Sequence, residues 1–308
     1  MKLENAAGVF PIAPTPFAPD GAIDWPSVER LFDFYGQIGA DGVTVLGILG
    51  EASKLEAQES LDIVERAVEI MGDKPVIVGV SAPGFAAMRA LAREAMDAGA
   101  SGVMIAPPHG LRSDDQIATY FAQAAEAVGG DVPFVVQDYP LMTNVVMTPG
   151  IIRRIATENA NCAMLKAEDW PGLEKISTLR KWQAEGALRP LPILVANGGL
   201  FLDFEMERGA DGSNTGYAFP EMLIDVVAWS KAGQRGRAHD LFDAHLPLLR
   251  YEQQMGAGLA VRKYVLMKRG ILTHDAQRKP GAELSAVARA EVDYLLERLA
   301  RIDSRAKL

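Results

Sequence analysis

The chain has a single cysteine and few histidines. Its 308 residues include one Cys, Cys162, and four His. One cysteine excludes a disulfide within the chain and a cysteine-based metal cluster, and the four histidines are not spaced as metal ligands. We therefore expect no metal centre, and we interpret Cys162 as a small core residue rather than a nucleophile.

Long apolar runs and clusters of positive charge are also missing. No stretch approaches the roughly 18 uninterrupted apolar residues of a membrane span, and residues 1–17 have no continuous apolar segment after a basic start. The formal net charge is -9, whereas surfaces that bind nucleic acid or anionic membranes need clustered Lys and Arg. We expect a cytoplasmic protein with no nucleic-acid or membrane partner.

Short apolar runs alternate with segments of helical periodicity along the chain. Eight runs, rich in β-branched or apolar residues, recur about every 30 residues, the length of one βα unit. They occupy residues 9–17, 42–47, 75–81, 102–108, 133–140, 163–168, 192–198 and 210–216. Amphipathic segments follow the first three at 25–38, 56–71 and 85–98. Eight such units predict an α/β protein with a closed (β/α)8 TIM barrel.

A doubly wound open sheet is the alternative, since it also alternates strands with helices. Such a sheet usually has fewer strands and a Gly-rich phosphate loop after the first one, whereas the first run here ends in APTPF. After the eighth run, helical patterns cover residues 221–231, 237–250, 259–269 and 284–301. We predict a barrel core at 1–220, and at 221–308 the last barrel helix with a helical extension of the same domain. Segment 273–281 is the one convincing linker.

One charged residue interrupts a run that should be buried. Lys166 follows Met164 and Leu165 near the end of the sixth run, in CAMLKAED. The active site of a (β/α)8 barrel lies at the carboxyl ends of the strands, so a polar residue there is a candidate for chemistry. An unprotonated lysine attacks ketones, and the resulting iminium is an electron sink for the neighbouring carbons. The alternative is a structural lysine that reaches the barrel rim.

Other polar residues share this end of the predicted barrel. Glu168 lies two residues after Lys166, so strand alternation places both side chains on one face. Glu168 is thus a candidate proton shuttle, or else a rim carboxylate in an ion pair. In VVQDYP, Gln137 and Tyr139 share one face and Asp138 the other, which makes Gln137 an inward hydrogen-bonding group or a structural residue.

The second run leads into a glycine-containing turn. GILGEASKL places Gly47 and Gly50 around a tight turn, where backbone N–H groups can hold a substrate carboxylate. Glu51 follows this turn and is either a structural carboxylate that accepts N–H bonds or a catalytic one. By itself this turn does not distinguish a binding loop from a structural one.

At these positions the chain resembles the dihydrodipicolinate synthase and N-acetylneuraminate lyase family of Schiff-base aldolases and dehydratases. GVFPIAPTPF is similar to the family's opening strand, GILGEASKL to its G-x-x-G-E-x-x-x-L loop, and VVQDYP to its strand-five motif. MLKAED carries the Schiff-base lysine at Lys166, and NGG and GADGSNTG resemble later family turns. The resemblance implies a (β/α)8 barrel with C-terminal helices, an imine on Lys166 without a further cofactor, and a homotetramer or homodimer.

The resemblance also implies roles for particular residues. Lys166, Glu168 and Gln137 are the expected catalytic residues. Substrate binding is expected at the residues of the strand-two loop and of the later strand ends, namely Gly47, Ile48, Leu49, Gly50, His109, Asn197, Gly198 and Thr215.

Several positions depart from the synthases of this family. Ile48 and Leu49 replace two threonines, Gln137 replaces a tyrosine, His109 replaces the tyrosine after strand four, and Met142 replaces an arginine that would receive an aldehyde substrate's carboxylate. An amide cannot exchange protons as a phenol does. These departures disfavour strict dihydrodipicolinate synthase activity.

The combination of QD-x-P with K-x-E, together with LPLLRYEQQMGAG, resembles the sugar-acid branch that includes 2-keto-3-deoxyarabonate dehydratases. We therefore expect a class I lyase that acts on pyruvate or a 2-keto-3-deoxy sugar acid, in which Glu168 or a bound water moves the C3 proton. Two alternatives stay open. One is a 4-hydroxy-tetrahydrodipicolinate synthase with an atypical site, and the other is an inactive regulator that binds keto acids.

Overall fold

Eight short parallel strands form the centre of the molecule. The computed structural model describes residues 2–308. Its strands are β1 Gly8–Val9, β2 Val43–Val45, β3 Val76–Gly79, β4 Gly102–Ile105, β5 Phe134–Asp138, β6 Cys162–Ala167, β7 Ile193–Val195 and β8 Gly212–Ser213. They form one sheet in the order β1-β8-β7-β6-β5-β4-β3-β2, and a parallel bridge between Ile12 and Thr44 joins its two ends. The predicted (β/α)8 barrel is confirmed.

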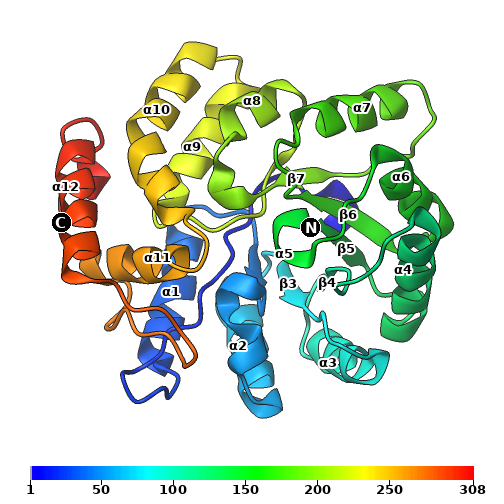
Figure 1. The fold of residues 1–308 in the computed structure, drawn as a ribbon, viewed down its shortest axis with the longest axis horizontal. Helices are drawn as coiled ribbons and strands as arrows, with labels where there is room; N and C mark the ends of the chain where they lie inside the picture. The colour runs from blue at the N-terminus through cyan, green and yellow to red at the C-terminus, as the bar shows by residue number, and fades with distance from the viewer. Residues whose placement is uncertain (1) are drawn as a thin grey trace.

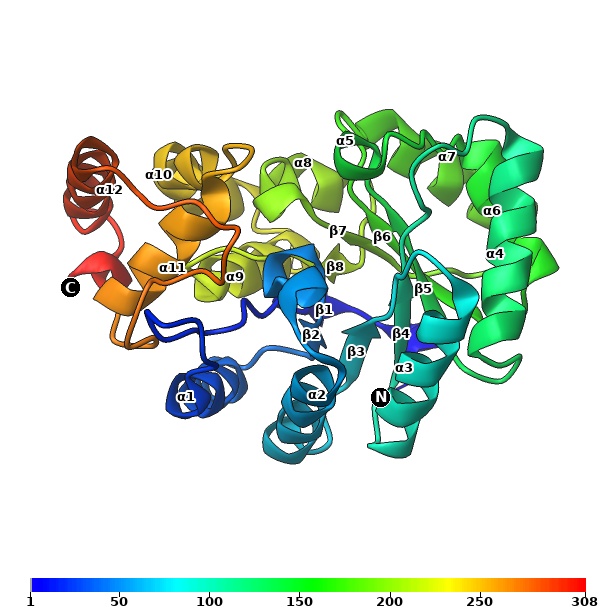
Figure 2. The ribbon, with the colours of Figure 1, turned by 60° about the horizontal axis from the view of Figure 1, so that its bottom comes forward.

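Helices surround this sheet, and the last three gather on one side of it (Figures 1 and 2). The helices are α1 Trp25–Gln37, α2 Ala57–Met71, α3 Phe85–Asp97, α4 Asp114–Val128, α5 Pro140–Thr143, α6 Pro149–Glu158, α7 Leu173–Ala184, α8 Leu202–Glu207, α9 Pro220–Lys231, α10 Arg235–Glu252, α11 Gly258–Lys268 and α12 Ala286–Leu299. The predicted helices differ from these by at most two residues at either end. None of the helices in residues 2–308 has the length and apolar character needed to cross a membrane.

Local sequence explains where several helices begin. Asp24 precedes α1 and its side chain accepts a hydrogen bond from the Ser27 amide, as a helix N-cap does. Ser113 and Gln116 form a capping box at the start of α4. Such caps satisfy amides that have no partner within the helix, and so they fix the residue at which the helix begins. The loop from the preceding strand must end at that residue.

The predicted strand runs are longer than the observed ladders. The run predicted at 9–17 is in a ladder only at its start, while Ile12 and Phe17 take part in isolated bridges. The last residues of each run leave the sheet and build the rim of the barrel. The division of the chain into 1–220 and 221–308 stays a prediction.

Two hydrophobic clusters fill the molecule, one inside the barrel and one between strands and helices. Inward side chains of several strands and residues that flank β1 form the inner cluster, which comprises Leu3, Ala6, Phe10, Ile77, Met104, Val135, Ala163, Met164 and Leu194. A register shift between β5 and β6 at Phe134 and Val135 places Ala163 in the inner cluster and Cys162 in the outer one. Burial raises the pKa of the Cys162 thiol to about 12, which agrees with a core residue.

The C-terminal segment is tied to the loop after β2 by a buried ion pair. Lys263 of α11 is fully buried and its Nζ lies 2.5 Å from Glu51 Oε1, while Lys54 Nζ lies 2.7 Å from Glu51 Oε2. The predicted linker at 273–281 takes part too, because the Ala276 carbonyl accepts from Lys263 and the Arg278 carbonyl accepts from Lys54. This linker is irregular, as predicted, but it is held against the barrel.

We expect the two lysines that share Glu51 to differ in their effect on stability. Lys263→Met removes the buried partner of a buried carboxylate and should lower the free energy of unfolding by about 3–5 kcal/mol. Lys54→Met removes a more exposed partner and should cost about 1 kcal/mol or less. Urea unfolding of both variants measures the difference, and equal losses would contradict the proposed role of Lys263.

Candidate active site

The ladder between β5 and β6 places the expected catalytic residues side by side. Gln137 and Lys166 are register partners on these neighbouring strands. Lys166 lies two residues beyond Met164 of the inner cluster, and Glu168 lies just beyond the end of β6. Lys166, Glu168 and Gln137 are 4%, 5% and 3% exposed. The three polar side chains are therefore buried together where the apolar barrel interior ends.

These side chains form a hydrogen-bonded ion pair. Lys166 Nζ lies 2.8 Å from Glu168 Oε1, and Gln137 Nε2 donates to the same carboxylate oxygen at 2.6 Å. The side-chain amide of Asn197 donates to the Glu168 main-chain carbonyl at 2.8 Å. Proton transfer requires contact at about 2.6–3.2 Å, so Glu168 is placed to exchange a proton with the Lys166 amine.

A cavity of about 250 Å³ opens onto this pair. It brings together most residues expected in the site, which are Gln137, Lys166, Glu168, Ile48, Leu49, Asn197, Gly198 and Thr215. Thr215 Oγ1 accepts from the Gly198 amide at 2.8 Å, and this bond joins the loops that follow β7 and β8. Because Ile12, beyond β1, also lines it, the carboxyl ends of six strands contribute to one cavity.

Three expected residues lie elsewhere. Gly47 and His109 line an adjoining cavity of about 580 Å³, which shares Ile48, Gln137 and Met142 with the first. His109 is exposed on the loop after β4 and does not line the Lys166 cavity. Gly50 lines neither cavity, and its carbonyl instead accepts a hydrogen bond from Thr15 Oγ1 at 2.6 Å. Gly50 therefore anchors the turn that carries Ile48 and Leu49.

The loop after β2 has a constrained backbone. Leu46 and Glu51, which flank it, both have a φ of 55°, in the left-handed region that residues other than glycine seldom adopt. Between them, residues 48–50 form a short 3-10 turn. The first amides of such a turn have no partner within it, so those of Ile48 and Leu49 are donors beside the cavity that these residues line.

The two residues that follow Gln137, Asp138 and Tyr139, point in opposite directions, as strand alternation predicts. Tyr139 lines the cavity, and burial, together with nearby Glu168, raises the pKa of its phenol to about 12. Asp138 is fully buried away from the cavity and lies 2.6 Å from Lys175 Nζ of α7. Tyr139 is therefore a neutral phenol in the site, and Asp138 holds α7 against the barrel.

One wall of the cavity comes from residues that the sequence did not indicate. The last residue of α10 contributes Glu252, the link to α11 contributes Gln253, Gln254 and Met255, and α11 contributes Arg262. The available signal was the polar stretch EQQ within LPLLRYEQQMGAG. Without the packing of α11 on the barrel, nothing in that stretch indicates which side chains face Lys166.

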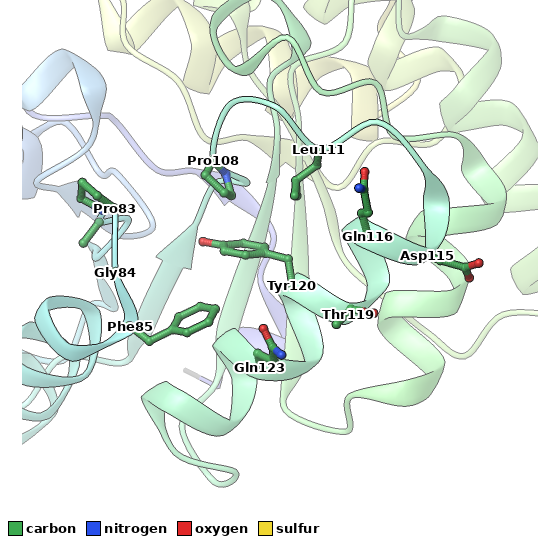
Figure 3. A pocket seen from close by; sticks show the side chains of 11 residues that line it. Pro83, Gly84, Phe85, Pro108, Leu111, Asp115, Gln116, Thr119, Tyr120 and Gln123 are labelled. Atoms are coloured by element: carbon green, nitrogen blue, oxygen red, sulfur yellow. The ribbon is translucent and has the colours of Figure 1, made fainter.

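A further hollow, of about 480 Å³, lies between α4 and the segment that leads into α3 (Figure 3). Pro83, Phe85 and Tyr120 form much of its wall, and Asp115 is its one charged lining residue. It has no residue in common with the Lys166 cavity and contains no lysine. This hollow therefore offers no amine that could form a Schiff base.

Known proteins resemble this chain over nearly its whole length. The L-2-keto-3-deoxyarabonate dehydratase of Azospirillum brasilense is 28% identical over 298 residues, which cover 95% of this chain and 94% of that protein. The 4-hydroxy-tetrahydrodipicolinate synthase of Chlorobium luteolum is 29% identical over 293 residues, with 94% and 95% covered.

A solved structure and a family model give the same result. The crystal structure of dihydrodipicolinate synthase from Rhodopseudomonas palustris matches with a TM-score of 0.95 and 66% identity, covering 97% of this chain and 99% of that chain. The model of the dihydrodipicolinate synthetase family matches residues 5–299. Because that match spans almost the whole chain, the protein belongs to the dihydrodipicolinate synthetase family, as its motifs predict.

Proposed function

We propose that the protein is a Schiff-base lyase that dehydrates a 2-keto-3-deoxy sugar acid, with Lys166 as the nucleophile. The observation that carries this proposal is the buried Lys166 amine, 2.8 Å from the Glu168 carboxylate in a cavity at the strand ends. The similarity to a sugar-acid dehydratase along nearly the whole chain supports this reaction.

Imine formation is the first step. Glu168 accepts a proton from the Lys166 ammonium, and the free amine attacks the C2 ketone of the substrate. Glu168 delivers this proton and then a second one from the attached nitrogen to the C2 oxygen, which leaves as water, and the products are an iminium on Lys166 and an ionised Glu168. The amides of Ile48 and Leu49 are the donors that we assign to the substrate's carboxylate.

Elimination follows from the iminium. Glu168 takes a proton from C3, and the electron pair forms an enamine. The C4–O bond then breaks, and the hydroxyl leaves as water with the proton from Glu168. Hydrolysis of the conjugated iminium frees the product and Lys166, so the substrate loses one water in total and no oxidant or reductant is needed. Gln137, whose amide does not titrate, orients Glu168 throughout.

A second candidate is a 4-hydroxy-tetrahydrodipicolinate synthase. The observation in its favour is the 66% identity to the Rhodopseudomonas palustris structure, which has the name dihydrodipicolinate synthase. The cavity argues against it, because Ile48, Leu49 and Gln137 line it where the synthases have hydroxyl-bearing residues. Met142, in place of the arginine, also lines this cavity and has no charge for the aldehyde's carboxylate.

We further propose, as the family resemblance implies, that the protein is a cytoplasmic homotetramer or homodimer and that it needs no cofactor besides the imine.

Trapping with borohydride tests the nucleophile. Reduction in the presence of pyruvate or a 2-keto-3-deoxy acid should add the mass of the reduced ligand at Lys166, because borohydride reduces an iminium to a stable amine. Lys166→Met should abolish the adduct. Lys181→Met, at an exposed lysine, is the matched control and should keep it. Peptide mass spectrometry measures the outcome, and wild-type protein without an adduct for any 2-keto acid would refute the proposal.

The role of Glu168 is tested by Glu168→Gln, which keeps the size of the side chain but removes the base. We expect turnover of the sugar acid to fall by roughly 10²- to 10⁴-fold, the usual contribution of a general acid–base residue. Adducts trapped at long incubation should persist, since the Lys166 amine remains. Steady-state dehydration kinetics measure the change, and a variant within tenfold of the wild type would assign the proton transfers to water.

A coupled assay separates the candidates. Pyruvate and aspartate semialdehyde, with a reductase that consumes the condensation product, should give no signal above background if the protein is a sugar-acid dehydratase. The same preparation should dehydrate a 2-keto-3-deoxy acid. Efficient condensation would favour the synthase. Thermal stabilisation by keto acids, without turnover in either assay, would favour the inactive regulator.

A further inference from the structure

Two buried hydrogen-bond donors in the Lys166 cavity lack partners. Arg262 Nη1 and Gln253 Nε2 are both inaccessible to solvent and form no hydrogen bond within residues 2–308. Both residues line the same cavity as Lys166 and Glu168. Buried donors are nearly always paired in proteins, so two unpaired ones in the wall of one cavity indicate a ligand with oxygen acceptors.

Structural contacts fix the orientation of Arg262 but leave this nitrogen unused. The Arg262 side chain is 3% exposed, its Nε donates to Glu252 Oε1 at 2.5 Å, and its Nη2 donates to the Gly216 carbonyl at 2.7 Å. Glu252 is held in turn by the Ala218 amide, which donates to its other oxygen at 3.1 Å. Two nitrogens of the guanidinium are therefore paired before any ligand arrives, and a small shift of the side chain would turn the third, unpaired nitrogen towards a ligand in the cavity.

Two glycines make room for these donors at the strand ends. A Cβ atom at Gly216 would lie 2.0 Å from Arg262 Nη1, and a Cβ atom at Gly198 would lie 2.0 Å from Gln253 Nε2. Any larger residue at either position would push the donor away. The loops after β7 and β8 thus bring the guanidinium and the amide close to the backbone beside Thr215, which also lines the cavity.

We propose that Arg262 and Gln253 form a subsite for the hydroxylated tail of the substrate, beyond the carbons that react at Lys166. This inference rests on the proposed function. Pyruvate bound to Lys166 ends at C3 and has no oxygen with which to reach a tail subsite, whereas a five- or six-carbon sugar acid has hydroxyl groups on C4 and beyond. The subsite therefore selects sugar acids over pyruvate.

The charges of the wall favour hydroxyl groups over a second carboxylate. Glu252 already neutralises Arg262 at hydrogen-bond distance, and Gln253 is uncharged. A second carboxylate on the ligand would lie near both Glu252 and Glu168 without an unpaired cation to balance it. Hydroxyl oxygens accept from the two donors without adding charge.

Ligand selectivity at Lys166 tests this subsite. Borohydride trapping gives the half-saturating concentration for pyruvate, for 2-keto-3-deoxygluconate and for 2-oxoadipate, which has a second carboxylate and no hydroxyl. Gln253→Met removes the amide donors at similar length, and Arg262→Lys keeps the charge but removes the guanidinium fork. The preference for 2-keto-3-deoxygluconate over pyruvate should fall tenfold or more in each variant. Gln123→Met, in the outer hollow of Figure 3, is the matched control and should keep the preference.

Other results would overturn either the subsite or the proposed function. A preference that stays within twofold of the wild type in folded variants would overturn the subsite while leaving the imine intact. A preference of the wild type for 2-oxoadipate that these variants lose would also overturn it, because the donors would then bind a carboxylate. Wild-type protein that traps no keto acid would refute the proposed function itself. If thermal unfolding shows that Arg262→Lys is not folded, Gln253→Met decides, since the side-chain nitrogen of Gln253 has no hydrogen-bond partner within residues 2–308.

Discussion

The parallel register between β5 and β6 determines which side chains meet at the centre of the site. It places Gln137 beside Lys166, and alternation along the chain places Glu168 on the same side. A slip of one residue would turn Lys166 into the apolar layer between strands and helices and would bring Leu165 into the cavity, because successive side chains of a strand face opposite ways. Met164 belongs to the inner cluster, and its packing against side chains of the neighbouring strands fixes this register.

Two buried ion pairs line the cavity and a third holds the loop after β2, and the three have different consequences. Lys263 with Glu51 ties α11 to the loop after β2, and Arg262 with Glu252 ties α11 to the end of α10. The first pair connects elements far apart in the sequence, whereas the second joins two consecutive helices, and both help to make this side of the barrel rigid. Lys166 and Glu168 belong to one strand end and connect nothing distant. Burying charge is unfavourable unless it is compensated. A buried ion pair that holds no distant elements together is therefore better explained by the catalytic role that we propose for it.

Much of this fold can be predicted from sequence because its signals are local. Eight repeats of an apolar run followed by a helical pattern specify the barrel, and alternation places Lys166 with Glu168 and Tyr139 with Gln137. The register shift that separates Ala163 from Cys162 has no local signal, because it depends on pairing between two strands. The exposed position of His109 and the inward position of Arg262 depend on how a loop and α11 pack on the barrel. Sequence periodicity does not encode that packing.

The replacement of hydroxyl groups around Lys166 changes which group can carry a proton. Ile48 and Leu49 have no exchangeable side-chain proton, Gln137 is an amide, and the raised pKa of Tyr139 keeps its phenol neutral. Among the cavity residues near Lys166, the carboxylate of Glu168 is the group that is both in hydrogen-bond contact with the amine and able to change its charge. A single carboxylate suits an elimination, in which the proton removed from C3 leaves again with the C4 oxygen. A condensation with a second substrate requires proton transfers at more than one centre, for which this cavity has fewer groups.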